Sequence, residues 1–193
     1  MEAVKHLSMT ELEAGMEYIC QSPRDHGVVK MIARRPRDDE REVVHEAELD
    51  VQQGLIGDNW KTRGSKHMPD GSANPNAQIT VMNARTIELL AQAQERWPLA
   101  GDQLYIDMEL SDDNLPPGTR LSIGSAILEV SAQPHTGCRK FSDRFGVEAT
   151  KFVNSPEGKR LQLRGINTRV LRAGVIRVGD VVRKIDGTIR QEN

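Results

Sequence analysis

The stretch TRLSIGSAILEVSA, residues 119–132, contains two short β-like runs with a glycine between them. Both runs, TRLSI and AILEVSA, are rich in branched apolar residues, which favour strands. Gly124 and Ser125 join them, and a two-residue link that begins with glycine is typical of a tight hairpin turn. The stretch therefore predicts an antiparallel hairpin.

Short candidate strands also stand on both sides of this hairpin. Residues 26–34 and 41–49 have extended patterns and are separated by a charged, proline-marked turn, so we expect a second hairpin there. Further strands are predicted at 78–83, at 103–110 and, as short valine-rich runs, within 165–185. Most of these strands are short and connected as hairpins, which indicates a mainly antiparallel sheet.

Three segments show helical patterns instead. A short helix that Gly15 weakens is predicted at 9–19, the clearest helix at 84–97, and another at 138–155. No regular strand–helix alternation and no glycine-rich phosphate loop is visible, which argues against a doubly wound α/β fold. We therefore predict one domain over residues 1–193, mainly β: an antiparallel, partly closed β-barrel with a few helices packed outside it.

The composition is that of a globular protein, with 37% hydrophobic and 28% charged residues among 193. The longest apolar runs fall far short of the roughly 20 residues that a membrane-spanning helix needs. The N-terminal stretch carries early acids and no secretory pattern, so we expect a cytoplasmic protein with no membrane contact. The two cysteines, Cys20 and Cys138, are then expected to be free thiols.

A long segment without apolar periodicity, residues 54–77, is rich in Gly, Pro, Asn and Ser. Loops of this length are usually functional lids or disordered segments. We predict a flexible loop at about 60–77 that acts as a lid, with Lys61, Arg63 and Lys66 able to close over a phosphate group.

Charge is distributed unevenly along the chain. Residues 1–138 hold 13 Lys and Arg against 22 Asp and Glu, whereas residues 139–193 hold 13 against 6. A local excess of cations suggests an anionic partner, such as the phosphate of a ligand or of nucleic acid. The alternative is that the two parts neutralise each other in the fold.

The stretch QPHTGCRKFSDRFG, residues 133–146, places Cys138 directly after a glycine and before three cations, Arg139, Lys140 and Arg144. Positive charges stabilise the thiolate, which is the form of cysteine that reacts or binds metals. The glycine would let the chain turn sharply and leave the sulfur accessible. The alternative is that Cys138 is a small buried hydrophobe, as free cysteines often are.

Three chemical roles are conceivable for this cysteine. Cys138 and Arg144 have the spacing of a cysteine phosphatase loop, but the bulky RKFSD between them includes Asp143, which would repel a phosphate. His135 and Cys138 could begin a zinc site, but no second close pair supplies the other ligands. The third role makes Cys138 a persulfide carrier or a soft thiolate ligand of a transition metal. Cys138 and His135 are thus the candidate catalytic residues.

The segment KRLQLRGINTRVLR, residues 159–172, supplies five cations and no acid. A strand through INTRV would place Asn167 and Arg169 on one face, with Arg164 just before it. Arginine binds phosphate in a bidentate manner and asparagine can recognise the edge of a heterocycle. This set suits a phosphorylated heterocyclic cofactor, although a solvated cationic strand on the barrel exterior is the alternative.

A nucleic-acid-binding module would also explain the cationic tail. The three phenylalanines, Phe141, Phe145 and Phe152, lie in the same region, and single-strand-binding proteins combine aromatic residues with cations. However, these residues recur at helical spacing, which predicts an apolar face that seats a helix on the barrel. We therefore expect no nucleic-acid partner.

The chain resembles the MOSC domain, the module named for the C-terminal part of molybdenum cofactor sulfurases. The resemblance rests on PHTGCRKFSDRFG (134–146), LRGINTRVL (163–171) and VGDVV (178–182). Similarity to the short stand-alone bacterial branch of the family extends over GLIGDNW (54–60), QITVMNAR (78–85) and NLPPGTRLSIGSAILEV (114–130).

This resemblance implies a β-barrel of the pyruvate-kinase-barrel type. It also implies that Cys138 handles sulfur or binds the molybdenum of a molybdopterin cofactor, with His135 at the rim of the pocket. The candidate cofactor-binding residues are Lys140, Arg144, Arg164, Asn167 and Arg169.

Two roles are known in the family that the chain resembles. Some members are sulfurases fused to a pyridoxal-phosphate-dependent desulfurase domain, for which this chain has no room, so pyridoxal phosphate would belong to a cysteine desulfurase partner. Other members reduce N-hydroxylated small molecules with a bound molybdenum cofactor and electrons from a separate donor protein. The stand-alone length favours the reductase, and a sulfur carrier that uses a cysteine persulfide is the alternative.

Overall fold

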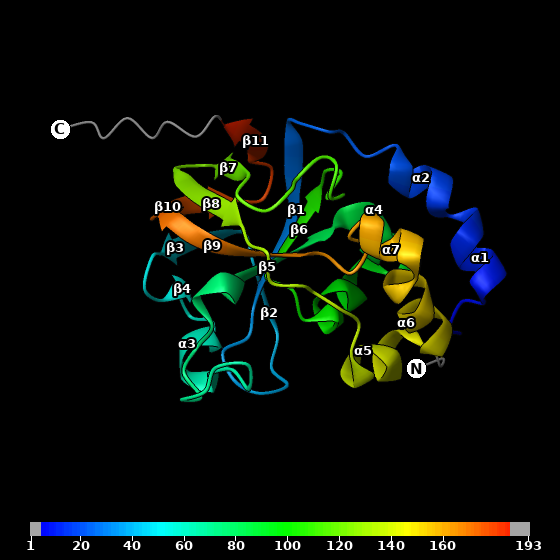
Figure 1. The fold of residues 1–193 in the computed structure, drawn as a ribbon, viewed down its shortest axis with the longest axis horizontal. Coiled ribbons are helices and arrows are strands. Elements are labelled where there is room, and N and C mark those ends of the chain that lie inside the picture. Colours follow the sequence, from blue (N-terminus) through cyan, green and yellow to red (C-terminus); the bar gives the residue numbers. More distant parts are fainter. Residues whose placement is uncertain (1–4, 186–193) are drawn as a thin grey trace.

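The structure, a computed structural model, describes residues 5–185 of the chain (Figure 1). The strands are β1 (Gly27–Arg34), β2 (Glu42–Val44), β3 (Glu46–Asp50), β4 (Gly54–Leu55), β5 (Ile79–Asn83), β6 (Leu104–Asp107), β7 (Arg120–Ile123), β8 (Ala126–Val130), β9 (Ile166–Arg172), β10 (Gly174–Arg177) and β11 (Val181–Ile185). The α-helices are α1 (Met9–Ala14), α2 (Met16–Cys20), α3 (Trp60–Arg63), α4 (Ala84–Ala91), α5 (Arg139–Phe145), α6 (Val147–Asn154) and α7 (Pro156–Arg160), and the 3₁₀ helices are η1 (Pro75–Ala77) and η2 (Gln94–Ala100). No helix within residues 5–185 has both the length and the apolar character needed to cross a membrane.

Seven strands close into a barrel in the order β11, β7, β8, β9, β5, β6 and β1, and β1 pairs with β11 again. Every pairing around the barrel is antiparallel except that of β5 with β6. Closure satisfies the backbone groups that the edges of an open sheet would leave unpaired. The predicted β-barrel with helices outside it is confirmed.

The hairpin predicted at residues 119–132 forms strands β7 and β8. Ile123 pairs with Ala126 across a turn made by Gly124 and Ser125. Gly124 has a φ of +54°, a backbone conformation that glycine adopts without strain. The core inside the barrel includes five apolar residues of these strands: Leu121, Ile123, Ala126, Leu128 and Val130.

The parallel pair β5 and β6 needs a crossover connection, which α4 and η2 provide. The predicted helix at 84–97 is too long, because α4 ends at Ala91 and Gln92 takes a left-handed conformation with φ +60°. The chain then packs back against the barrel, where the hydroxyl of Tyr105 donates to the carbonyl of Trp97 at 2.7 Å.

The predicted hairpin of residues 26–34 and 41–49 forms only in part. β2 pairs with β1, but a bend at His45 separates β2 from β3. β3 then joins β10 and β4 in a second, three-stranded sheet. This bend lets Ala47 and Leu49 of β3 bury their side chains against the barrel core.

Helices α1, α2, α5, α6 and α7 gather on one side of the barrel (Figure 1). The predicted helix at 138–155 is divided by Gly146, which has a φ of +99°, and the predicted N-terminal helix is divided at Gly15. A second apolar core fills the space between these helices and the outer face of the barrel.

The three phenylalanines belong to this second core. Phe141, Phe145 and Phe152 are at most 2% exposed. The prediction that they seat helices on the barrel is confirmed, and none of them is free to stack on a base.

Candidate functional site

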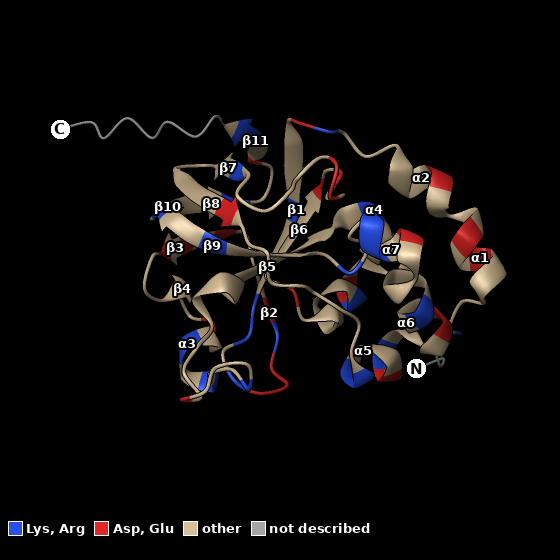
Figure 2. Cartoon of the chain, in the orientation of Figure 1, with Lys and Arg blue, Asp and Glu red and all other residues tan. Residues whose placement is uncertain are grey.

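A cavity of about 440 Å³ lies between the turn that joins β1 and β2, the loop after α3, and the segment that leads into α5. We call it the cationic cavity, because among residues 5–185 eight Lys and Arg but only two acids, Asp38 and Asp39, line it. Figure 2 shows blue on the same elements, beside β2, around α3 and on α5. The cationic residues of the lining are Arg35, Arg37, Arg41, Arg63, Lys66, Lys140, Arg144 and Arg164.

The positive charges of this cavity repel one another. The pKa of Arg41 is lowered by its burial and then by the charges of Arg144 and Arg35. The pKa of Arg63 is lowered by desolvation and then by the charge of Arg35. An anion in the cavity would relieve this repulsion.

Some cations of the cavity already form ion pairs with carboxylates of the chain, and others do not. The buried Arg35 forms two hydrogen bonds of 2.9 Å to the carboxylate of Asp58, which has no exposed side-chain surface. By contrast, the side chains of Arg63 and Lys66 form no hydrogen bond or ion pair within residues 5–185. These two residues are therefore available to a ligand.

Cys138 is exposed and lies on the wall of the cationic cavity. Its backbone carbonyl accepts from the amide of Ser142, so Cys138 stands directly before the first turn of α5. Gly137 does not have a positive φ, so its backbone conformation does not itself require glycine. A Cβ on Gly137 would instead lie 3.1 Å from Val153 and 3.2 Å from Asn154, so glycine is needed for close packing on α6.

The segment before Cys138 is irregular but firmly attached. The amide of Asn167 donates to the carbonyls of Gln133 at 3.0 Å and Pro134 at 3.2 Å. Further along, the amide of Gly137 donates to Asn154 Oδ1 at 2.9 Å, and Asn154 returns a bond of 3.1 Å to the carbonyl of Gly137. Hydrogen bonds therefore hold the backbone of this segment near both of its ends.

His135 lies within this held segment and is bonded to a buried acid. Its Nε2 lies 2.8 Å from Oδ1 of Asp102, and Nη1 of Arg164 donates to Oδ2 of the same carboxylate at 2.7 Å. Asp102 has no exposed side-chain surface. Asp102 therefore joins His135, three residues before Cys138, to Arg164, which precedes β9.

The protonation states of Asp102 and His135 follow from their surroundings. Burial acts to raise the pKa of Asp102, but Arg164 and then His135 outweigh burial and lower it, so the carboxylate is ionised. Burial, followed by the charge of Arg164, lowers the pKa of His135 in spite of Asp102. An ionised carboxylate can only accept, so the proton of neutral His135 sits on Nε2, and Nδ1 is left as an acceptor.

Arg164 lines the cationic cavity although it is buried. Beyond Asp102, it donates to the carbonyl of Ala100 at 2.9 Å and lies over the ring of Phe141 with its Cζ 4.8 Å from the ring centroid. Its Nε has no hydrogen-bond partner among the described residues. Arg164 thus has one donor to spare.

Lys140 and Arg144 extend from α5 toward the β1–β2 turn. Both face Asp39, with nitrogen–oxygen distances of 3.5 Å for Lys140 and 3.4 Å for Arg144. Arg144 also donates to the carbonyl of Leu99 at 2.7 Å. The side chain of Asp39 is 70% exposed. An anionic ligand could therefore replace its carboxylate as the partner of Lys140 and Arg144.

The structure separates Asn167 and Arg169, which the sequence placed together in the cofactor pocket. Asn167 lines the cavity, but its amide holds the segment before Cys138. Arg169 does not line the cavity, because it pairs with Glu129 on the neighbouring strand β8. Cross-strand pairing explains the difference, since opposite charges on adjacent strands attract each other.

Residues 60–77 begin with α3, and residues of this loop line the cavity, as expected of a lid. Arg63 and Lys66 are among them, whereas Lys61 is not. The loop closes on itself through hydrogen bonds from Ser65 to Gly71 and from Gly71 to Met68. Its mobility stays a prediction.

Sequence reasoning missed the contribution of the β1–β2 turn. The sequence predicts Arg35 and Arg37 in a charged turn and Arg41 at the start of a strand, yet all three line the cavity. The signal was present, since four arginines fall within residues 34–41. Asp102 was also missed, and a lone acid after a glycine gives no sign of its burial.

Comparison with known protein families adds a finding to this geometry. The MOSC domain family matches residues 57–183, which is more than half of the chain. The chain belongs to the MOSC domain family. The matched region of this MOSC domain includes Cys138 and His135 but begins after the arginines of the β1–β2 turn.

Solved structures agree with this MOSC fold. One, described only as a hypothetical protein, has 20% identity and a TM-score of 0.57, covering 84% of this chain and 69% of that one. YiiM from Escherichia coli has 16% identity and a TM-score of 0.54, covering 83% and 71%. The APC1665 YUAD protein from Bacillus subtilis has 16% identity and a TM-score of 0.55, covering 81% and 93%. Identities this low show a shared fold alone, and no curated protein matches the chain.

Proposed function

We propose that this MOSC domain binds a molybdopterin-type molybdenum cofactor in the cationic cavity and uses it to reduce small N-hydroxylated compounds. The observation that carries the proposal is an exposed thiol, Cys138, on the wall of a cavity with six more cations than acids. A phosphorylated pterin brings negative charge, and a thiolate is a preferred ligand for a soft metal.

The residues of the cavity fit such a group. Arg63 and Lys66 have no partners within residues 5–185, and Nε of the buried Arg164 has none either. Of these groups, the side chains of Arg63 and Lys66 can donate to phosphate or to the pterin edge. No cluster of three or more His, Cys, Asp or Glu in the described residues could hold a metal ion. A cofactor whose organic part already ligates the metal needs only one protein thiolate, and Cys138 would supply it.

The cofactor, when bound, supplies two-electron redox chemistry at molybdenum. Reduction of an N-hydroxylated compound breaks the N–O bond with two electrons and two protons, and releases the amine-type product and water. A donor protein would provide the electrons. In this chain, Asp102 fixes the ring of His135 and leaves Nδ1 as an acceptor that can take up and pass on a proton.

A sulfur carrier is the second candidate function, and the exposure of Cys138 favours it. A cysteine desulfurase that carries its own pyridoxal phosphate and a persulfide on its own cysteine could transfer the outer sulfur to the Cys138 thiolate. The S–S bond of the donor breaks, its cysteine leaves as a thiolate, and Cys138 becomes the persulfide. The same cations would then stabilise the charged sulfur.

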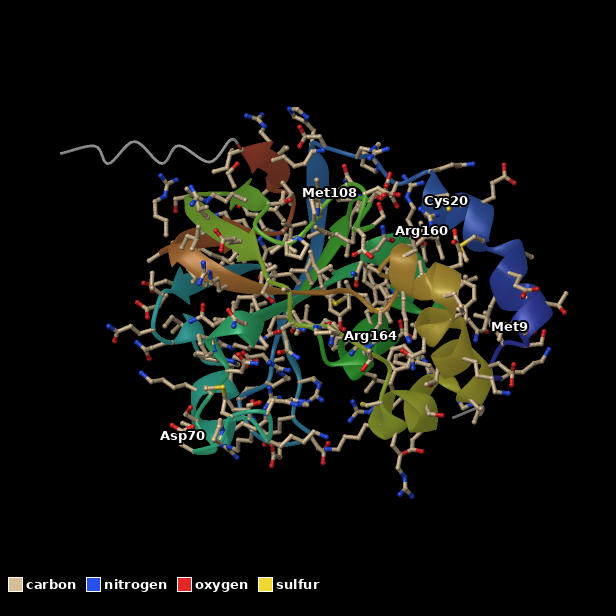
Figure 3. All side chains as sticks on the ribbon, in the orientation of Figure 1. Met9, Cys20, Asp70, Met108, Arg160 and Arg164 are labelled. Atoms are coloured by element: carbon tan, nitrogen blue, oxygen red, sulfur yellow. The ribbon has the colours of Figure 1, made fainter. Side chains whose placement is uncertain are left out.

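Substitution of Cys138 separates these functions from a structural role. Cys138→Ser should lose molybdenum, measured by elemental mass spectrometry of freshly purified protein, without a change in folding. Cys20→Ser is the matched control, because Cys20 lies on α2, away from Arg164 (Figure 3). Full molybdenum content in Cys138→Ser would overturn the proposal. A persulfide on Cys138 of molybdenum-free wild type would support the carrier instead.

A further inference from the structure

The turn between β1 and β2 carries both acids that line the cationic cavity among residues 5–185. We call residues 36–40 of this turn the strap. Figure 1 shows the turn between α3 and α5, and Figure 2 shows acidic residues at its tip. Asp38 and Asp39 are adjacent on the strap, so its position decides how much of the positive charge of the cavity is balanced.

Both ends of the strap are firmly anchored. Before it, the backbone amide and Nε of Arg35 donate to Oδ2 of Asp58, each at 2.9 Å. Asp58 has no exposed side-chain surface, and hydrogen bonds to a buried carboxylate are strong. After the strap, Nε of Arg41 donates to the carbonyl of Pro98 at 3.1 Å. The strap can therefore move only between fixed ends.

The tip of the strap is held more weakly, by contacts on two sides of the cavity. Oδ1 of Asp39 lies 3.5 Å from Nζ of Lys140 and 3.4 Å from Nη2 of Arg144, both on α5. On the side of α3, Nδ2 of Asn59 lies 3.5 Å from Oδ1 of Asp38. All three distances are longer than those of a typical hydrogen bond, and exposed ion pairs contribute little to stability. The tip is therefore easily released.

The backbone of the strap also favours release. Asp39 has a φ of +60°, a left-handed conformation that is unfavourable for residues other than glycine. One backbone hydrogen bond, from the amide of Glu40 to the carbonyl of Arg37 at 3.2 Å, closes the turn. The contacts of Asp39 with α5 therefore compensate for an unfavourable conformation, and their loss would let the strap relax.

An anionic ligand would compete with the strap for the same cations. Lys140 and Arg144 line the cavity and can bind either the carboxylate of Asp39 or a phosphate group. A phosphate in this position would also repel Asp38 and Asp39, because like charges would lie side by side. Binding of the phosphate and contact of the strap with α5 therefore exclude each other.

We propose that the strap is an anion-operated gate. Asp39 binds it to α5 while the cavity is empty, and a phosphate group that replaces Asp39 on Lys140 and Arg144 releases it. An anion that cannot displace Asp39 from both cations leaves the strap in place, so the strap makes the cavity selective for phosphate groups over weaker anions. This inference rests on the proposed function, because it describes how the cavity of that function admits a phosphorylated ligand.

Amide hydrogen exchange, followed by NMR, tests the gate with pyrophosphate as the probe. In the wild type, pyrophosphate should speed the exchange of the Glu40 amide about three-fold or more, because an opened turn loses its protection. Asp39→Asn should exchange fast without pyrophosphate, each rate being compared with that of an unstructured peptide of the same sequence. Asp143→Asn removes an exposed acid of α5 that does not line the cavity, and should exchange like the wild type.

A second pair of variants leaves the sequence of the strap unchanged. Lys140→Gln removes one partner of Asp39 and should also speed exchange of the Glu40 amide. Arg139→Gln is its matched control, because Arg139 is an exposed cation of α5 that does not line the cavity.

Unchanged or slower exchange in the wild type with pyrophosphate would overturn the gate, since slower exchange would mean that the strap closes over the anion. Wild-type exchange in Asp39→Asn, or no binding of pyrophosphate at millimolar concentration, would overturn it too. The experiment has no molybdenum readout. Failure of the proposed function is seen separately, as molybdenum that Cys138→Ser retains.

Discussion

Nε2 of His135 lies 2.8 Å from a carboxylate oxygen of Asp102, a residue that precedes β6 and has no exposed side-chain surface. The other oxygen of the same carboxylate accepts from Arg164, which precedes β9. Strands β5 and β9 are neighbours in the barrel, and β5 also pairs with β6. The closed barrel thus brings together three residues that lie far apart in the sequence.

Loss of the Asp102 charge should destabilise the protein strongly. Asp102→Asn leaves the buried Arg164 without a counter-charge, which should lower the free energy of unfolding by about 3 kcal/mol or more. Asp39→Asn is the matched control, since Asp39 is 70% exposed and should contribute less than about 1 kcal/mol. Urea unfolding of both variants measures the difference, and equal losses would contradict the role given to Asp102.

His135 should make stability depend on pH. Burial and Arg164 lower its pKa in the folded state, whereas in the unfolded state it titrates near its usual value of about 6.5. As the pH falls below about 6.5, the unfolded state binds a proton that the folded state does not, so stability declines by up to ~1.4 kcal/mol per pH unit. This decline ends once the pH is below the folded pKa.

The variant His135→Gln tests this dependence. In urea unfolding between pH 5 and pH 8, it should show a smaller loss of stability below about pH 6.5 than the wild type. His45→Gln, which changes an exposed histidine, should keep the wild-type slope. A wild-type slope in His135→Gln would show that another group causes the decline.

Local sequence patterns predicted the barrel but not the way its parts meet. The β7–β8 hairpin follows from branched residues around a glycine, which act over a few positions. The separation of β2 from β3 does not follow from local patterns, because Ala47 and Leu49 pack into a core that is formed by strands distant in the sequence.

The site was predicted in the same uneven way. Cys138 could be recognised because its cations are close to it in the sequence, and it does line a cationic cavity. The sequence also predicted Arg169 in this cavity, because Asn167 and Arg169 share one face of strand β9. The strand that lies beside β9 could not be known from the sequence. It is β8, and its Glu129 pairs with Arg169. The arginines of the β1–β2 turn and Asp102 join the site only through closure of the barrel. The sequence therefore indicated site residues that lie close to Cys138 along the chain, but not those that lie far from it.

Asp39 should compete with an anionic ligand. It lies 3.5 Å from Lys140 and 3.4 Å from Arg144, so its charge occupies cations that a ligand would use. Asp39→Asn should raise the affinity for pyrophosphate several-fold at low salt, because removing a like charge lowers repulsion. Calorimetry at two salt concentrations measures this, and the gain should shrink at high salt.

Asp143→Asn is the control for that experiment, because Asp143 is an exposed acid on α5 that does not line the cavity. A similar gain in both variants would mean that overall charge, and not the position of Asp39, determines anion affinity.

Arg63 and Arg169 should differ in their importance for cofactor binding. Arg63 lines the cavity and has no partner within residues 5–185, whereas Arg169 lies outside it and pairs with Glu129. A charge-assisted hydrogen bond contributes about 1.5–3 kcal/mol, so Arg63→Ala should lower pyrophosphate affinity about ten-fold or more and reduce molybdenum content. Arg169→Ala removes the same charge and should change neither by more than about two-fold.

The same pair of variants separates cofactor binding from nucleic-acid binding. On a nucleic-acid surface, many phosphate contacts share the binding energy, so a single alanine has a modest effect and affinity falls steeply with salt. Submicromolar, salt-sensitive binding of a labelled single strand, weakened equally by Arg63→Ala and Arg169→Ala, would favour that alternative. Weak strand binding together with selective loss of molybdenum in Arg63→Ala is the outcome that we expect, because the cations concentrate in one cavity and the phenylalanines that could stack on bases are buried.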